Sequence, residues 1–260
     1  MSANSFGRIF RFTSFGESHG EAMGVIIDGC PSGIPCDSAL FNQALQRRRP
    51  GDHAGTSQRR ELDQVRILSG LHQGKTTGSP IAVLVPNIDV QSAAYKKQAA
   101  LLRPGHGQFT YEQKYGKVDL RGGGRASARE TLCRVIAGAL AQTVLQRQGV
   151  SLYAFLVQLA ELRHPGSAQD WAKSMPKVDK SQLYCFDQSI QAAMLQRIRE
   201  LQSSGDSVGG KVFFAAKGLP IGLGAPLYQK MEAELAYAML SIPASKSFEI
   251  GAGLAAVSMT

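Results

Sequence analysis

The sequence predicts an α+β protein in which long helices accompany layered antiparallel sheets. Short apolar or alternating runs are typical of strands, and longer runs with apolar residues at three- and four-residue steps indicate helices. Helices do not follow the strands in a regular series, so antiparallel pairing is favoured over parallel β-α-β units. The 260 residues, 43% of them hydrophobic, are enough to bury a large core. No internal repeat or change of composition divides the chain, and we expect one domain over residues 1–260.

Strands are expected where short runs are apolar or alternate between apolar and polar residues. The expected strands are residues 8–13, 23–27, 65–68, 81–85, 150–162 and 212–216. Glycine and proline residues lie between several of these runs and mark turns. The strands therefore occur as neighbours as well as between helices.

Helices are expected between these strands. The side chain of Asp37 or Ser38 can cap a first helix, which Pro50 ends. The clearest helix follows Ser127, because apolar residues recur there at three- and four-residue steps, and Gly149 is placed to end it. Two more amphipathic helices are expected at residues 190–201 and 231–242, and a polar connector at residues 165–180.

The charge of the chain points to an anionic ligand. A net charge of +9 fits a nucleic acid, a membrane surface or an anionic small molecule. Thirteen of the 17 arginines lie in residues 1–134, whereas the lysines are spread over residues 75–246. Arginine is suited to fixed, bidentate contacts with phosphate and carboxylate, so we expect an anion site in the N-terminal half.

The cysteines indicate neither a disulfide framework nor a zinc site. All four are scattered, without a CxxC pair or histidines at ligand spacing, and no metal is expected. No apolar run reaches the ~18 residues of a membrane span, and the first residues lack the apolar core of a signal peptide. We therefore expect a cytoplasmic protein with no membrane partner.

Two short motifs place a histidine in a glycine-containing turn. Residues 16–20 follow a predicted strand and can present Ser18 and His19 to a ligand. Considered alone, a histidine in a polar turn is equally well structural, and no aspartate within this segment orients it. Arg103 and His106 lie three residues apart in a second turn. His106 is the better acid candidate, because a nearby phosphate would stabilise its imidazolium form.

A run of arginines, residues 47–49, closes the first predicted helix, and two more follow at residues 59 and 60. Cations at a helix C-terminus are favourable in themselves, so a solvated cap is one interpretation. The other is an anion site, because this many arginines repel one another without compensating charge. Acidic partners such as Glu61 and Asp63 would provide that compensation equally well.

A glycine-rich loop at residues 119–127 leads into the clearest helix. Helix N-termini present unpaired N–H groups, which favour phosphate. The loop is neither a Walker A motif nor a Rossmann fingerprint, since the GK[ST] ending and the regular β-α-β context are missing. A cofactor phosphate or an anionic substrate is the expected ligand. Arg125 and Arg129, one helical turn apart, are expected to face the same anion.

Seven motifs in order and in register resemble one family. They are GESHG at 16–20, RRRPG at 47–51, QRRE at 58–61, TTGSPI at 76–81, RPGH at 103–106, YGKVDLRGGGRASARET at 115–131 and GDSVGGKV at 205–212. One of them alone would be a weak signal, but the whole series is specific. From about residue 7 to residue 253, the chain resembles chorismate synthase.

The resemblance implies a lyase of the shikimate pathway, which leads to the aromatic amino acids. Its reaction is the trans-1,4-elimination of phosphate from 5-enolpyruvylshikimate-3-phosphate, giving chorismate, and it requires reduced FMN although there is no net redox change. The family fold is a β-α-β sandwich, with long helices between antiparallel sheets. The resemblance also implies that the protein assembles as a homotetramer.

The resemblance also assigns roles to the residues of the motifs. His19 is implied to protonate the leaving phosphate, and His106 to protonate or stabilise the reduced flavin. Ser18 is implied as a substrate or proton-relay contact. The substrate carries two carboxylates and a phosphate, so several fixed cations are needed to hold it. The implied substrate arginines are Arg48, Arg49, Arg103 and Arg129.

The same resemblance implies the cofactor contacts. The implied flavin contacts are Arg125, Ala126, Ser127 and Ala244, the last of which is usually supplied by a neighbouring subunit. Arg48 matches one of two arginines linked to NADPH in relatives, but Ala54 stands at the position of the other. NADPH is therefore expected only as an indirect reductant.

The sequence departs from the family pattern at its end. It stops at Thr260, before the family's flavin-phosphate loop and an Arg-His-Asp-Pro segment. We expect weak FMN binding and little or no turnover from these 260 residues by themselves. Two alternatives stay open, an inactive remnant that binds the anionic substrate and a basic RNA-binding module. The second lacks the interleaved aromatic residues typical of RNA binding.

Overall fold

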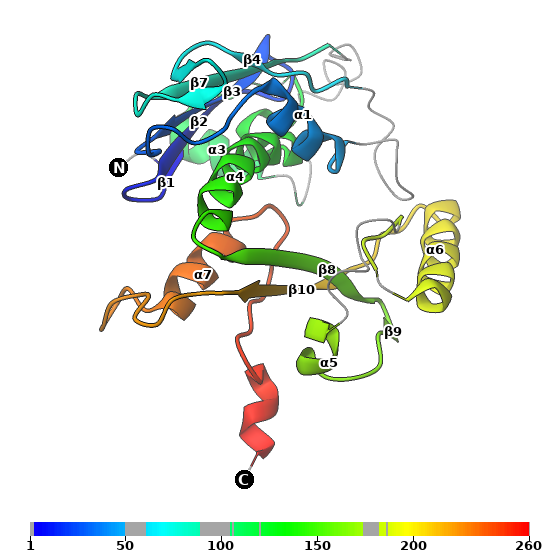
Figure 1. Ribbon diagram of the computed structural model, residues 1–260. Helices are drawn as coiled ribbons and strands as arrows, with labels where there is room; N and C mark the ends of the chain where they lie inside the picture. Colours follow the sequence, from blue (N-terminus) through cyan, green and yellow to red (C-terminus); the bar gives the residue numbers. More distant parts are fainter. Residues whose placement is uncertain are drawn as a thin grey trace. The chain divides into compact units, whose positions relative to one another are not determined.

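The computed structural model describes most of the chain. The described residues are 3–49, 61–88, 105, 107–119, 121–173, 182–185 and 187–259. They form two compact units that alternate along the sequence (Figure 1). Unit 1 consists of the described residues of Met1–Arg49, Arg60–Arg147 and Tyr237–Ser247, and unit 2 of those of Gln148–Ala236 and Phe248–Thr260. The single domain expected over residues 1–260 stays a prediction.

The main sheet of unit 1 has five antiparallel strands in the order β1-β2-β3-β7-β4. These are β1 (Ser5–Phe6), β2 (Arg11–Gly16), β3 (Ala22–Asp28), β7 (Ile81–Pro86) and β4 (Arg66–Ile67). Phe12 of β2 lies opposite Ile27 of β3, which in turn lies opposite Ile81 of β7. A separate hairpin is formed by β5 (Leu71–His72) and β6 (Lys75–Thr76).

The predicted strands of this sheet are confirmed, with one shift. The strand expected at residues 8–13 begins at Arg11, because residues 8–10 form a bend. Gly7, just before the bend, has a φ of 91°, which side chains other than glycine rarely adopt. The alternating pattern of residues 8–13 therefore included three residues that belong to the turn.

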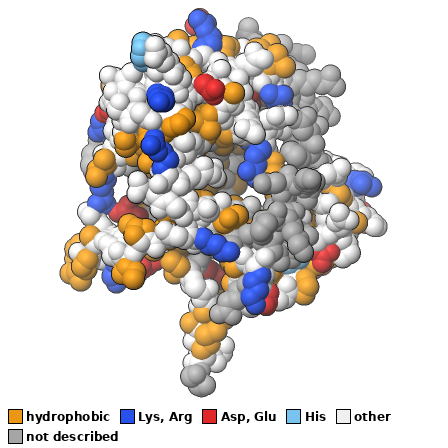
Figure 2. All heavy atoms as spheres, viewed as in Figure 1, with side chains coloured by type: hydrophobic (Ala, Val, Ile, Leu, Met, Phe, Trp, Pro, Cys, Tyr) orange, Lys and Arg blue, Asp and Glu red, His pale blue; other side chains and the backbone are white. Residues whose placement is uncertain are grey.

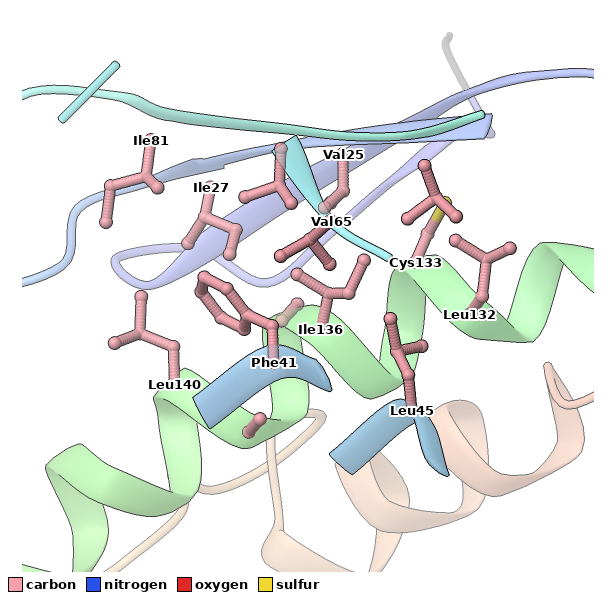
Figure 3. Packing of buried hydrophobic residues seen from close by; sticks show 14 of the residues in the cluster. Val25, Ile27, Phe41, Leu45, Val65, Ile81, Leu132, Cys133, Ile136 and Leu140 are labelled. Atoms are coloured by element: carbon pink, nitrogen blue, oxygen red, sulfur yellow. The ribbon is translucent and has the colours of Figure 1, made fainter. Parts of the chain in front are cut away.

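Two helices cover one face of the sheet, α1 (Ser38–Gln46) and α4 (Thr131–Gln146). Asp37 caps α1 as predicted, since its carboxylate accepts a hydrogen bond from the amide of Leu40 at 3.0 Å. Figure 1 shows both helices on the same side of the strands, and Figure 3 shows their apolar side chains directed towards the sheet. The residues labelled there are Val25, Ile27, Phe41, Leu45, Val65, Ile81, Leu132, Cys133, Ile136 and Leu140, all buried.

The remaining helix of unit 1 was not expected from the sequence. The helix α3 (Gln108–Tyr115) has no buried residue, so it lacks the apolar periodicity by which helices are recognised. The glycine-rich loop before α4 also differs from a simple helix start. It contains two short 3₁₀ turns, Gly124–Ala126 and Ala128–Glu130, with Ser127 extended between them.

Unit 2 contains a three-stranded antiparallel sheet in the order β10-β8-β9. Its elements are β8 (Ser151–Leu159), β9 (Leu162–Arg163), β10 (Gly210–Lys217), α5 (Ala168–Lys173) and α6 (Gln188–Ser203). The helix α7 (Met231–Leu240) begins in unit 2, and its last residues belong to unit 1. The strands expected near 150–162 and 212–216 and the helices near 190–201 and 231–242 are confirmed.

The polar connector expected at residues 165–180 is partly wrong, because α5 lies within it. Trp171 of α5 is 5% exposed, and its indole N–H donates to the carbonyl of Pro165 at 2.9 Å. Its ring lies 5.6 Å from that of Phe213 on β10. A single buried aromatic residue anchors a helix too short for a periodic pattern, so the surrounding polar residues concealed it.

The architecture is α+β, as predicted. All strand pairs in the described part of the chain are antiparallel. None of the helices in the described ranges has both the length and the apolar character required to cross a bilayer.

Candidate functional site

The turn that carries His19 follows β2 directly. The main chain can reverse there because Gly16 has a φ of 86°, and the amide of Gly20 donates to the carbonyl of Glu17 at 3.1 Å. Ser18 is fully buried and His19 is only 9% exposed. The Ser18 hydroxyl lies 2.9 Å from Nδ1 of His19. The imidazole ring is therefore oriented through one of its two nitrogens.

The glycine-rich loop packs directly against this turn. The amide of Ser18 donates to the carbonyl of Gly124 at 3.3 Å. Gly122 has a φ of 117°, and a Cβ atom at this position would overlap the imidazole of His19. Two motifs that are about one hundred residues apart in the sequence thus form one site, and glycine is required where they meet.

An acidic side chain of the same loop lies near His19. Asp119 accepts hydrogen bonds from the Arg121 guanidinium, the shortest at 2.9 Å. This hydrogen bond holds the pKa of Asp119 below its usual range, and the charge of His19 acts weakly in the same direction. Asp119 is therefore a carboxylate whose charge favours an imidazolium at His19. Sequence reasoning looked for such an aspartate only within residues 16–20.

Asn87 holds both ends of the His19 turn. Its side-chain amide donates to the carbonyls of Glu17 at 3.0 Å and Gly20 at 2.8 Å. Asn87 follows the last residue of β7, Pro86, so it ties the turn to the sheet. It was missed by the sequence analysis. The only signal available was a polar residue placed immediately after a buried strand.

Arg129 lies at the centre of a buried group of charged and polar side chains. It is 5% exposed, and its Nε donates to Oδ1 of Asn87 at 2.6 Å. Its Nη1 donates to Asp63 at 2.9 Å, and its Nη2 lies 3.8 Å from a carboxylate oxygen of Glu61. Asp63 also accepts from Nη1 of Arg48 at 3.2 Å. Glu61 and Asp63, the acidic partners named from the sequence, thus compensate the positive charges of Arg48 and Arg129.

Asp63 adopts an unusual backbone conformation where it joins these two arginines. Its φ of 47° is in the left-handed region, which aspartate tolerates better than most residues do. Both Asp63 and Glu61 are almost fully buried, at 2% and 3% exposure. Two carboxylates and two guanidinium groups balance in charge, which satisfies the usual requirement for charges in a protein interior.

Two N–H donors in the arginine cluster have hydrogen-bonding capacity left. Arg49 donates from Nη2 to the carbonyl of Leu62 at 2.6 Å, but its Nε is buried without a hydrogen-bond partner among the described residues. Within the same ranges, Nη2 of Arg129 is buried without a hydrogen bond. An unpaired buried donor costs about 1–3 kcal/mol. These are the two atoms of the cluster suited to an anionic ligand.

Arg125 does not face the same direction as Arg129, contrary to expectation. Its Nη1 donates to the carbonyl of Gly16 at 3.0 Å, and its Nη2 donates to the hydroxyl of Ser14 at 2.7 Å. The extended residue Ser127 separates the two 3₁₀ turns, so the arginines are not one helical turn apart. Arg125 instead ties the loop to β2.

A pocket of about 330 Å³ lies beside Arg125 within unit 1. Arg125, Ala126, Arg134, Tyr237 and Pro243 are among its lining residues. It brings together the two segments expected to contact the flavin, since Ala126 is in the first segment and Pro243 precedes Ala244 in the second. Its size is at the lower end of small-molecule sites, and its cations and aromatic rings suit a flat anionic ligand.

Hydrogen bonds join the polar side chains around this pocket. Ser14 donates to Glu130 at 3.0 Å, and Arg134 donates to the same carboxylate at 2.9 Å. Arg134 also donates from Nη1 to the hydroxyl of Ser241 at 2.6 Å. Ser241 is thereby tied to the start of α4. Ala244 nearby has a φ of 67°, which is uncommon for alanine.

Several expected site residues lie outside the described residues, namely Arg103, His106 and Ala54. The four cysteines are buried, and none of them forms a disulfide. The described ranges contain no group of three or more His, Cys, Asp or Glu side chains able to hold a metal. In Figure 2, the Lys and Arg side chains of the visible face stand singly or in small groups among uncharged atoms.

The fold and the site together define the class of the protein. It is an α+β enzyme, with a buried histidine after strand β2 and a cluster of arginines from the end of α1 and the start of α4. The family model for chorismate synthase matches residues 10–260. The chain belongs to the chorismate synthase family, whose members are lyases.

Individual relatives agree with the family model. Chorismate synthase of Protochlamydia amoebophila is 49% identical over all of this chain and 71% of its own length. That of Syntrophobacter fumaroxidans is 49% identical over all of this chain and 72% of its own length. A crystal structure of chorismate synthase superposes with a TM-score of 0.80 at 30% identity, covering 97% of this chain and 71% of the other. The match therefore extends over the whole of this chain and less than three quarters of each relative.

Proposed function

We propose that the chain catalyses trans-1,4-elimination of phosphate from 5-enolpyruvylshikimate-3-phosphate to give chorismate, with His19 as the acid. The observation that carries this proposal is the buried Ser18–His19 pair, held under the glycine-rich loop. Elimination of phosphate requires a proton at the departing oxygen unless another charge stabilises it. A buried imidazole beside a cluster of arginines suits that requirement.

Ser18 and Asp119 assist His19 in this proposal. In this proposal the Ser18 hydroxyl, 2.9 Å from Nδ1, orients the ring, and Nε2 delivers the proton. The carboxylate of Asp119 favours the protonated ring electrostatically. Burial of the turn limits the access of water, which strengthens both interactions.

Substrate binding is proposed for Arg48, Arg49, Arg103 and Arg129. The substrate carries two carboxylates and a phosphate, so it requires more than one fixed cation. Arg49 Nε and Arg129 Nη2 have no hydrogen-bond partner in the described ranges, which supports a direct role for both. Arg48 shares Asp63 with Arg129 and acts as part of the same buried cluster.

Reduced FMN is the proposed cofactor. The residues proposed to hold it are Arg125, Ala126 and Ser127 of one subunit and Ala244 of a neighbouring subunit, and Arg125 and Ala126 line the pocket described above. When bound, reduced flavin supplies electron density to the reacting ring of the substrate. His106 is proposed to protonate or stabilise the flavin. NADPH is proposed only as an indirect reductant.

The proposal extends to the assembly and location of the protein. A homotetramer is proposed from family membership, with Ala244 contacting the flavin of a neighbouring subunit. A cytoplasmic location fits the small, charged metabolite on which the proposed reaction acts. Neither nucleic acid nor a membrane is proposed as a partner.

The test is chorismate formation under anaerobic conditions with saturating reduced FMN. We expect at most slow chorismate formation, in line with the little or no turnover expected from the sequence, and we expect His19→Gln to lower kcat by about 10²–10⁴-fold, the usual contribution of an acid catalyst. His72→Gln is the matched control, because His72 is an exposed histidine of the β5–β6 hairpin.

The competing outcomes are distinct. Wild-type protein that binds 5-enolpyruvylshikimate-3-phosphate in calorimetry but forms no chorismate would identify an inactive substrate-binding protein. Turnover that His19→Gln leaves unchanged would remove His19 from the mechanism. Salt-sensitive RNA binding without affinity for the substrate would contradict the proposal as a whole.

A further inference from the structure

The His19 turn has few internal hydrogen bonds of its own. Its one backbone hydrogen bond between turn residues in the described structure is from Gly20 to Glu17, at 3.1 Å. This bond closes the turn but does not attach it to the sheet. The amide of Ser18 joins the turn to the glycine-rich loop, and the side-chain amide of Asn87 joins it to the end of β7. The two N–H groups of Asn87 reach the carbonyls of Glu17 and Gly20, one on either side of His19.

Arg129 determines which way the Asn87 amide faces. The two ends of an asparagine amide have almost the same shape, so its orientation must follow from its partners. Nε of Arg129 is a donor only, and it lies 2.6 Å from the Asn87 side chain. The atom at that distance must therefore be the oxygen. The NH₂ group then points to the two carbonyls of the turn, which can only accept.

Both partners are themselves held in place by buried groups. Arg129 is fixed by Asp63 at 2.9 Å and by the charge of Glu61 at 3.8 Å. The backbone around Asn87 is fixed as well. The backbone N–H of Asn87 donates to the carbonyl of Glu21 at 2.9 Å, and the backbone N–H of Ile88 donates to the carboxylate of Glu61 at 3.0 Å. A series of contacts thus runs from the acidic pair through Arg129 and Asn87 to the turn.

We propose that Asn87 is a positioning residue that locks the His19 turn for proton transfer, and that Arg129 sets the orientation in which it acts. This inference rests on the proposed function of His19. Proton transfer tolerates displacements of only ~0.5 Å in the acid, so a loosened turn lowers turnover more than substrate affinity. Nη2 of Arg129 makes no hydrogen bond within the described ranges and is suited to the substrate, so one guanidinium would contact both the substrate and Asn87.

The test is Asn87→Asp, which preserves the shape of the side chain. The carboxylate still accepts from Arg129, so the buried cluster keeps its hydrogen bond. It cannot donate to the carbonyls of Glu17 and Gly20, and it repels them. We expect amide hydrogen exchange in residues 17–20 to accelerate at least about 10-fold, and kcat to fall by about 10-fold or more while substrate KM stays within about threefold.

The matched control is Gln158→Glu in β8 of unit 2. The Gln158 amide also donates to a backbone carbonyl, that of Ala160 at 2.8 Å, and it belongs to unit 2, whereas the His19 turn belongs to unit 1. The same chemical change there should leave exchange in residues 17–20 and kcat unaffected. Asn87→Ala removes the donors without adding charge, and it should change exchange in the same direction as Asn87→Asp.

The outcomes separate this inference from the proposed function. If the amide hydrogen exchange rates of residues 17–20 are the same in Asn87→Asp as in the wild type, the positioning role is overturned, whatever the kcat of the variant. Accelerated exchange with unchanged kcat would show that catalysis does not need the attachment of the turn by Asn87, and would also overturn the positioning role. If His19→Gln is fully active while exchange responds to Asn87 as expected, the proposed role of His19 fails but the attachment of the turn stands.

Discussion

Gly122 lies against the imidazole ring of His19 so closely that a methyl group at this position would overlap three atoms of the ring. The two residues come from two motifs that are about one hundred residues apart in the sequence. Their contact makes the glycine-rich loop a wall of the His19 site as well as the start of a helix. The loop is therefore sensitive to side-chain size where it meets the ring.

Replacing Gly122 by alanine should displace His19. The added methyl group overlaps the ring, and a φ of 117° is unfavourable for alanine, so we expect a loss of stability of about 1–3 kcal/mol. We also expect kcat to fall at least about 10-fold through misplacement of the ring. Urea unfolding and steady-state kinetics measure the two effects.

Gly33→Ala is the control for Gly122→Ala. Gly33 also has a positive φ, 80°, but a Cβ atom there would have nothing within 4 Å. It should lose stability through backbone strain alone and keep its kcat. Equal losses of kcat in both variants would show that strain, and not the contact with His19, accounts for the result.

Asp63→Asn should destabilise unit 1 strongly. The change removes a fully buried charge shared by Arg48 and Arg129, and it leaves buried guanidinium charge uncompensated. We expect the free energy of unfolding to fall by about 3–5 kcal/mol. Asp28→Asn is the control, because Asp28 and Arg11 form an exposed pair that should be worth about 0–1 kcal/mol. Similar losses in both variants, measured by urea titration, would contradict this account.

Stability should depend on pH through His164 in unit 2. Burial lowers the pKa of His164 below its usual value near 6.5, and the charge of Asp187 opposes this only in part. The unfolded chain takes up a proton as pH falls through about 6.5, whereas the folded chain does so only at lower pH. The free energy of unfolding should therefore be unaffected above about pH 7 and should decrease as pH falls towards 5.

The variant His164→Gln should flatten this part of the pH profile. The single tryptophan, Trp171, lies in unit 2, so its fluorescence reports unfolding of that unit. The difference between wild-type and variant profiles isolates His164 from the carboxylates. A difference that is constant between pH 7 and 5 would count against the lowered pKa.

Arg125→Lys should weaken FMN binding and loosen the loop. A lysine has one charged nitrogen in place of the planar fork, so it cannot reach Gly16, Ser14 and Asn4 together as Arg125 does. We expect the Kd for FMN, followed by flavin fluorescence, to rise about 10-fold, equivalent to about 1.4 kcal/mol. Arg11→Lys is the control, because Arg11 lies on β2, the strand that Arg125 contacts. An equal rise in the Kd for FMN there would contradict a specific role of the Arg125 hydrogen bonds.

Local patterns were sufficient for most of the elements in this fold. The apolar runs of β3 and β7 and the periodicity of α4 are signals within a single segment, and the Asp37 cap is read from adjacent residues. Trp171 and α5 were missed because the helix is held by one aromatic contact with a strand about forty residues away. Helix α3 was missed because it buries no residue.

The site was predicted less completely than the fold, for a physical reason. Resemblance indicated His19 and the arginines, but the side chains that organise them are joined by hydrogen bonds between distant segments. Arg129 meets Asp63 across 66 residues, and Arg125 meets Ser14 across 111 residues. Asn87 and Asp119 carry no local pattern that distinguishes them from other polar residues. Such partners become visible only when the chain is folded.

Asp63 has a further consequence for any attempt to alter what this protein binds. Because one carboxylate serves both Arg48 and Arg129, the two cations are not independent positions. If a library of variants changes one of these arginines and keeps the other, most of its members will contain a buried charge without a compensating partner. Changing the ligand preference will therefore require the three residues to be redesigned as one set.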